Sequence, residues 1–72
     1  MCKILTAKLW DWYTNDRPGY LVKVYAEGER PLFIKSVYRN TYTFTHDPLY
    51  AKHFSYRTAK LHIANLLRKG EI

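Results

Sequence analysis

Apolar and polar residues alternate along the first two thirds of the chain, a pattern typical of β-strands. The alternation predicts four short strands, at residues 3–13, 20–27, 32–38 and 42–45. Residue types that favour turns separate these strands, at 14–19, 28–31 and 39–40. The first part of the chain is therefore expected to form a small antiparallel sheet.

The alternation also assigns side chains to the two faces of each strand. In the first strand, Leu5, Ala7 and Leu9 are expected on one face, and Ile4, Thr6, Lys8, Trp10 and Trp12 on the other. In the second, Tyr20, Val22, Val24 and Ala26 oppose Leu21, Lys23, Tyr25 and Glu27. The third is less regular, with Leu32, Ile34 and Ser36 opposite Phe33, Lys35 and Val37.

The pattern becomes helical near the end of the chain. Asp47 and Pro48 suit the start of a short helical turn, and Ser55 suits the N-cap of a helix over residues 56–69 that ends at Gly70. Within that helix an apolar stripe of about 100° is expected to face the core: Tyr56, Ala59, Ile63, Leu66 and Leu67. Leu61 falls among the polar residues of this helix. It is either an ordinary surface leucine or a residue that contacts a partner.

These elements predict an α+β fold. The expected architecture is a three- or four-stranded antiparallel sheet with one main C-terminal helix packed on one face, in a single small basic domain over residues 1–72. One helix covers one face of such a sheet. The other face stays open unless a second chain covers it.

Composition narrows the class of protein. Twelve Lys and Arg against six Asp and Glu give a net charge of +6, and the aromatic content of 17% is too high for a disordered chain. A single cysteine cannot form an internal disulfide, and no apolar run is long enough for a membrane span or a signal peptide. We therefore expect a cytoplasmic protein with no membrane partner.

The open sheet face is the first candidate site. If Leu5, Ala7, Leu9, Val22 and Val24 face the helix, then Lys8, Trp10, Trp12, Lys23 and Tyr25 face away, joined by Phe33 and Lys35 if the register of the third strand allows. Aromatic rings interleaved with lysines suit single-stranded nucleic acid. They equally suit a protein interface. In a third interpretation, both tryptophans belong to the core and the predicted alternation is off by one residue.

The helix is the second candidate site. Residues 48–72 carry five basic residues and one acid, a net +4, whereas residues 1–47 carry seven and five, a net +2. A basic helix attracts nucleic acid or an acidic protein groove, unless it is only a solvated face. The candidate contacts are Arg57, Leu61 and Arg68. If the two candidate groups lie on different surfaces, only one is the site.

Catalysis is not indicated. His46, His53 and His62 are spaced by seven and nine residues, not at the i, i+4 spacing that favours metal binding. Cys2 lies in no redox motif, Ser55 has no nucleophile elbow, and there is no phosphate-binding glycine loop. The sequence predicts no metal, no cofactor and no enzymatic activity.

One stretch resembles a known group of proteins. In this stretch a strand ends in Phe44-Thr45, Asp47 starts a turn, and Ala51 and Phe54 precede a terminal helix. This order resembles a pattern in short bacteriophage and prophage accessory proteins, including anti-CRISPR-type inhibitors of host defence. The resemblance implies binding without catalysis, to a host protein or nucleoprotein in the bacterial cytoplasm, and it transfers no site residue. Two alternatives stay open: a small DNA- or RNA-binding protein, and a homodimer that hides the open face.

Overall fold

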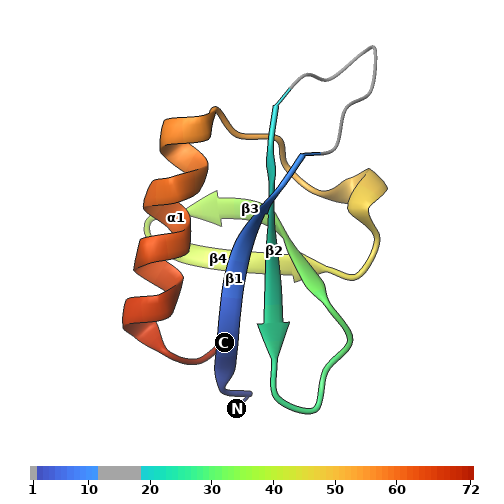
Figure 1. The fold of residues 1–72 in the computed structure, drawn as a ribbon, viewed down its shortest axis with the longest axis vertical. Helices are drawn as coiled ribbons and strands as arrows, with labels where there is room; N and C mark the ends of the chain where they lie inside the picture. Colours follow the sequence, from blue (N-terminus) through green and yellow to red (C-terminus); the bar gives the residue numbers. More distant parts are fainter. Residues whose placement is uncertain (1, 12–18) are drawn as a thin grey trace.

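Four antiparallel strands and one long helix make up the computed structural model, which describes residues 2–11 and 19–72. The strands are β1 (Ile4–Trp10), β2 (Leu21–Ala26), β3 (Leu32–Tyr38) and β4 (Thr41–Thr45), and they lie in that order in one sheet. A 3-10 turn, η1 (Pro48–Tyr50), leads to the helix α1 (Tyr56–Lys69) (Figure 1). The predicted α+β fold is confirmed.

The sheet is strongly twisted. In Figure 1, β1 and β2 run along the long axis of the molecule, and β3 and β4 cross behind them. The two halves are joined by only two residue pairs, Lys23 with Phe33 and Val24 with Leu32. The helix packs mainly on β1 and β2, so it covers one half of the sheet more completely than the other.

The ends of α1 follow from its capping residues. The Ser55 hydroxyl accepts a hydrogen bond from the Thr58 N–H at 3.3 Å. At the other end, Gly70 adopts the left-handed conformation, with φ +79°, and its N–H donates to the Leu66 carbonyl. The predicted limits of the helix are therefore confirmed.

The buried strip of α1 is narrower than predicted. Ala59 and Leu66 are buried and Ile63 is half-buried. The prediction is wrong for Tyr56 and Leu67, which are 55% and 48% exposed. They lie at one flank of the predicted stripe, beyond the strip of helix that rests on β1 and β2.

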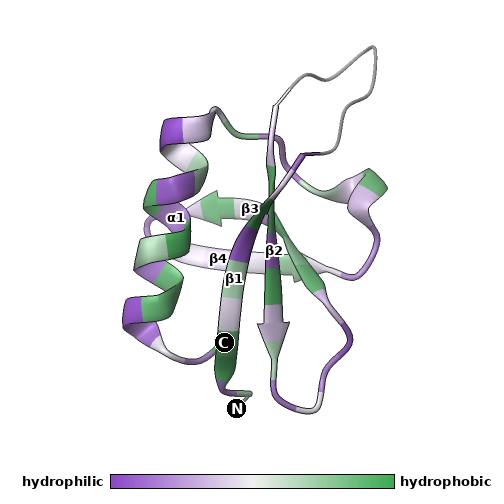
Figure 2. Cartoon of the chain, in the orientation of Figure 1, coloured by the Kyte–Doolittle hydropathy of each residue, from purple (hydrophilic) through white to green (hydrophobic). Residues whose placement is uncertain are grey.

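The main core lies between α1 and the sheet. Its buried residues include members of β1, β2 and β3 but none of β4. Tyr42 and Phe44 of β4 are half-buried and pack against this core. Figure 2 shows hydrophobic residues recurring along the strands, whereas the β2–β3 loop is mostly hydrophilic. The buried residues are Ile4, Ala7, Val22, Val24, Ala26, Leu32, Ile34, Phe54, Ala59 and Leu66.

A β-bulge in β1 overturns part of the predicted alternation. Ile4 pairs with Ala26 and Thr6 with Tyr25, so Leu5 is an extra residue in the strand. Ile4 is consequently buried, while Leu5 is 60% exposed. The facing predicted for these two residues is wrong because one inserted residue exchanges the faces of a strand beyond it.

A second bulge has the same effect in β3. Ile34 pairs with Phe44 and Ser36 with Thr43, which leaves Lys35 as the extra residue. Beyond it, Val37 packs against the main core, and the Ser36 hydroxyl lies on the other face, hydrogen-bonded to that of Thr43. The predicted facing of Ser36 and Val37 is wrong for this reason.

The segment between β4 and α1 crosses the end of the sheet. The Asp47 carboxylate accepts from the Leu49 N–H at 2.9 Å and starts η1 as predicted. Lys52 N–H then donates to the Ile34 carbonyl, and Phe54 and Tyr20 exchange two backbone hydrogen bonds, all at 2.9 Å. This segment therefore covers part of the sheet face that the sequence predicted to be open.

His62 sits beside the main core rather than on the surface of the helix. Its Nδ1 lies 2.9 Å from the Tyr42 hydroxyl, and its ring meets the Phe54 ring edge-on at 4.8 Å. Desolvation lowers the pKa of His62 from its ordinary value of 6.5, and the positive charge of Lys52 lowers it further.

The lowered pKa of His62 predicts a loss of stability in mild acid. Well above pH 6.5 the His62 imidazole is neutral in both the folded and the unfolded protein. As the pH falls below 6.5, the unfolded chain takes up the proton first because its pKa is higher. The free energy of unfolding therefore falls until the folded imidazole also protonates. Urea unfolding at pH 7.5 and pH 5.5 should show a smaller fall for His62→Gln than for wild type. An unchanged fall in His62→Gln would contradict the prediction.

Candidate binding surfaces

The structure brings four predicted site residues together on the sheet face away from α1. Lys8 and Trp10 come from β1, and Lys23 and Tyr25 from β2. Lys8 and Lys23 are directly opposite each other across the two strands. We call these four residues the lysine–aromatic patch.

The lysines of the patch lie over its rings. The Lys23 ammonium is 4.8 Å from the centroid of the Trp10 ring and 5.3 Å from that of Tyr25. The Lys8 ammonium is 5.7 Å from the Tyr25 ring. These distances are typical of cation–π interactions, in which an aromatic ring attracts an ammonium group that lies over its face.

A second, smaller core supports the patch from below. The Trp10 ring stacks on Phe33, with centroids 4.9 Å apart and an angle of 22° between the planes. Phe33 is buried together with Leu21 and Ala51, and Ala51 comes from the segment that crosses this end of the sheet. Leu21 was predicted on the open face, but Ala51 covers it. Phe33 joins the patch only as buried support.

The charge arrangement of the patch is unfavourable within the protein itself. Like charges directly opposite on neighbouring strands are destabilising. Neither Lys8 nor Lys23 forms an ion pair with a described residue; the ion pair found in residues 2–11 and 19–72 joins His46 to Glu29 at 3.6 Å. The patch therefore concentrates positive charge that the described part of the chain does not neutralise.

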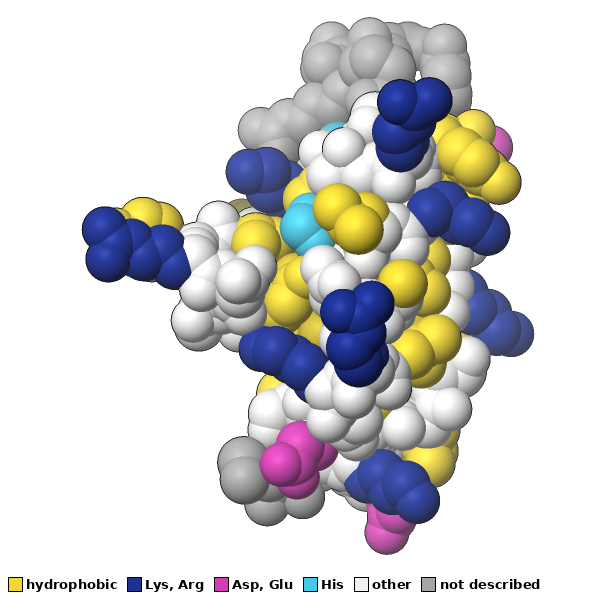
Figure 3. Space-filling view, turned by 90° about the vertical axis from the view of Figure 1, so that its left-hand side faces the viewer, with side chains coloured by type: hydrophobic (Ala, Val, Ile, Leu, Met, Phe, Trp, Pro, Cys, Tyr) yellow, Lys and Arg dark blue, Asp and Glu magenta, His cyan; other side chains and the backbone are white. Residues whose placement is uncertain are grey.

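The helix candidates form a separate surface. Arg57, Leu61 and Arg68 are all exposed, and their spacing places them along one stripe of α1. Figure 3 shows basic side chains spread over this side of the molecule, with hydrophobic ones between them. The patch and this stripe lie on opposite sides of the sheet, so one flat partner surface cannot contact both. Trp12, which was also predicted to be a site residue, lies outside the described residues. Lys35 is exposed at the β3 bulge rather than in the patch.

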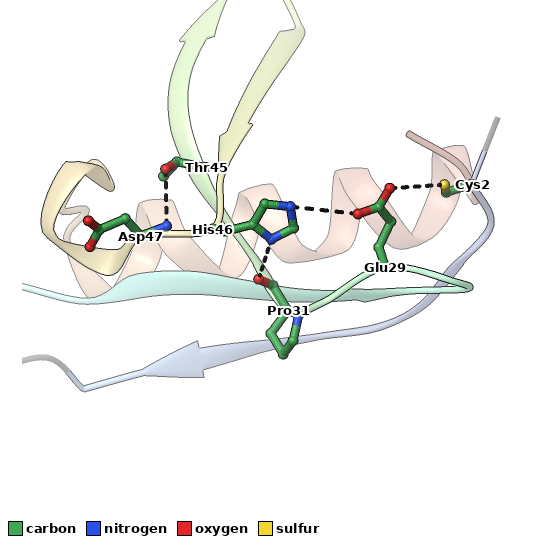
Figure 4. A network of polar contacts seen from close by, with 6 residues as sticks. All are labelled: Cys2, Glu29, Pro31, Thr45, His46 and Asp47. Carbon is green, nitrogen blue, oxygen red and sulfur yellow. Dashed lines mark hydrogen bonds and ion pairs between the residues drawn. The ribbon is translucent and has the colours of Figure 1, made fainter.

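A polar contact network joins the start of the chain, the β2–β3 loop and the residue that follows β4. Glu29 stands between Cys2 and His46, with its carboxylate 3.9 Å from the Cys2 sulfur and 3.6 Å from His46 Nε2 (Figure 4). His46 Nδ1 lies 3.2 Å from the Pro31 carbonyl, and the Asp47 side chain points away from the network. The imidazole therefore faces a carboxylate rather than the thiol. Within the described residues, no three His, Cys, Asp or Glu side chains converge on a metal position.

Sequence reasoning missed a set of hollows between β4 and the end of α1. One has a volume of about 270 Å³ and is lined by Asn40, Tyr42, Asn65, Arg68 and Lys69. These residues come from a turn, a strand and a helix that are distant in the sequence. No local spacing indicates the hollow, because it depends on where α1 lies over the sheet.

Comparison with protein-family models, with curated proteins and with solved structures gave no match. Across residues 2–11 and 19–72, no helix is both long enough and apolar enough to cross a bilayer.

Proposed function

We propose that the chain is a non-catalytic binding protein of the bacteriophage accessory type. In this proposal the lysine–aromatic patch docks on an acidic site of a host protein or nucleoprotein in the bacterial cytoplasm and inhibits or modulates it, as an anti-CRISPR-type inhibitor does. One observation carries the proposal: Lys8 and Lys23 face each other directly and are held over the rings of Trp10 and Tyr25.

An anionic partner would relieve the repulsion between these two lysines. The repulsion is present in the free protein, so a carboxylate placed between the ammonium groups stabilises the complex relative to the free state. The rings of Trp10 and Tyr25 add apolar contact area around that charge, and tryptophan, tyrosine and arginine are enriched among residues that dominate protein interfaces.

Ring accessibility supports a protein partner over stacked bases. One side of the Trp10 ring stacks on Phe33, and the Lys23 ammonium lies over both Trp10 and Tyr25. Phe33 itself is only 3% exposed. Base stacking needs open ring faces, whereas Phe33 occupies one face of Trp10 and lysine ammonium groups lie over Trp10 and Tyr25.

Direct nucleic-acid binding is the second candidate function. The net charge of +6 and the paired lysines of the patch favour it, because ammonium groups also bind phosphates. It requires nucleic-acid affinity that survives physiological salt, which charge attraction alone does not provide.

A fluorescence titration separates the two candidates. A Trp12→Phe variant leaves Trp10 as the reporter inside the patch, and it is titrated with single- and double-stranded DNA and RNA at low and at physiological salt. We expect a response at low salt that disappears at physiological salt. A saturable response that survives physiological salt would replace the proposed function with the second candidate.

A further inference from the structure

β4 presents an unpaired edge. It is the last strand of the sheet and pairs only with β3. The opposite edge is different: Ile4 N–H donates to the Gly70 carbonyl and Ile72 N–H to the Cys2 carbonyl, so the C-terminal residues pair with the start of the chain beside β1. No backbone group of Thr41–Thr45 makes such a bond to another described segment. The five residues of β4 include neither a charge nor a proline, the usual protections of an exposed edge.

The sequence of β4 is nearly symmetric about Thr43. Tyr42 and Phe44 flank it on the face toward the main core, and Thr41 and Thr45 follow on the other face. If two copies of β4 pair antiparallel about Thr43, each Tyr42 lies opposite Phe44 of the second copy, and each Thr41 lies opposite Thr45. Aromatic pairs and threonine pairs are both favourable across antiparallel strands.

We propose that the occupant of this edge is a second copy of the chain. The two β4 strands pair antiparallel about Thr43 and join the two sheets into one continuous eight-stranded sheet. A two-fold interface of this kind uses the same surface on both copies and closes on itself. It does not rest on the proposed function, since the lysine–aromatic patch lies on β1 and β2; in the dimer the two patches would share one face of the joined sheet.

Thr43→Lys tests the pairing and its register. At the centre of the interface this substitution places two ammonium groups directly opposite each other, whereas in a monomer the Thr43 side chain is exposed. Ser36→Lys is the matched control, because Ser36 is exposed on the same face, one strand further from the edge, and shares the same hydroxyl contact with Thr43. Thr43→Glu supplies an independent variant of opposite charge.

Sedimentation and light scattering give the mass from micromolar to about millimolar concentration, with circular dichroism confirming the fold of each variant. We expect wild type and Ser36→Lys to form dimers, Thr43→Lys and Thr43→Glu to be monomers when alone, and an equimolar mixture of the two to dimerise. A monomeric wild type throughout this range would overturn the proposal. So would a dimer that Thr43→Lys leaves intact, one that Ser36→Lys disrupts equally, or a mixture that stays monomeric.

Discussion

Replacing Phe33 with alanine is expected to lower the free energy of unfolding by about 3–5 kcal/mol. The Phe33 side chain is 3% exposed and fills the small core beneath the lysine–aromatic patch, where it stacks against Trp10. Alanine leaves a cavity there that the rigid strands close only in part. A domain of this length has a total stability of order 4–11 kcal/mol, so urea unfolding followed by circular dichroism will show a large shift or a partly unfolded protein.

Phe33→Leu is the control for this prediction. Leucine keeps the site apolar and most of its volume, and such substitutions usually cost less than about 1.5 kcal/mol. The Trp10 emission should change in both variants because its stacking partner is lost. Equal stability of Phe33→Ala and wild type would show that Phe33 does not support the patch as described.

Leu66→Ala is expected to destabilise the protein by about 2–5 kcal/mol. Leu66 is 1% exposed and is one of the two buried residues of α1. Removing three carbons there opens a cavity between the helix and the sheet. The loss should appear in urea unfolding and in thermal unfolding, and the helical signal should disappear together with the tertiary signal because the transition is cooperative.

The neighbouring residue provides a matched control for Leu66. Leu67 is 48% exposed in the same turn of the same helix, so Leu67→Ala tests the same chemical change without a cavity. Its effect should stay near the roughly ±0.5 kcal/mol typical of surface positions. Equal losses in the two variants would mean that α1 packs on the sheet through a different face.

The pattern of residues predicts most of the fold because its signals are local. Ser55, Gly70 and Asp47 act through bonds to their own neighbourhood, and strand alternation needs no distant partner until a bulge interrupts it. The bulges at Leu5 and Lys35 arise from pairing with other strands, which no local pattern records. Each one exchanged the faces of the residues near it.

The candidate site was predictable for a related reason. Lys8, Trp10, Lys23 and Tyr25 lie beyond the β1 bulge or on the regular β2, so their alternation holds and they share a face as predicted. The burial of Leu21 could not be predicted, because it depends on Ala51 crossing the sheet from a distant segment. The hollow beside Tyr42 depends in the same way on the position of α1, because Asn65, Arg68 and Lys69 line it.

The central claim is that partner binding belongs to the lysine–aromatic patch rather than to the basic helix. The most direct test compares two variants with equal changes of charge on opposite sides of the sheet: Lys8→Glu/Lys23→Glu and Arg57→Glu/Arg68→Glu. After both are shown to fold, each is used beside wild type to capture proteins and nucleoproteins from a bacterial lysate at physiological salt. The account predicts that the patch variant loses the partners that wild type retains and that the helix variant keeps them. Partners kept by the patch variant and lost by the helix variant would contradict it.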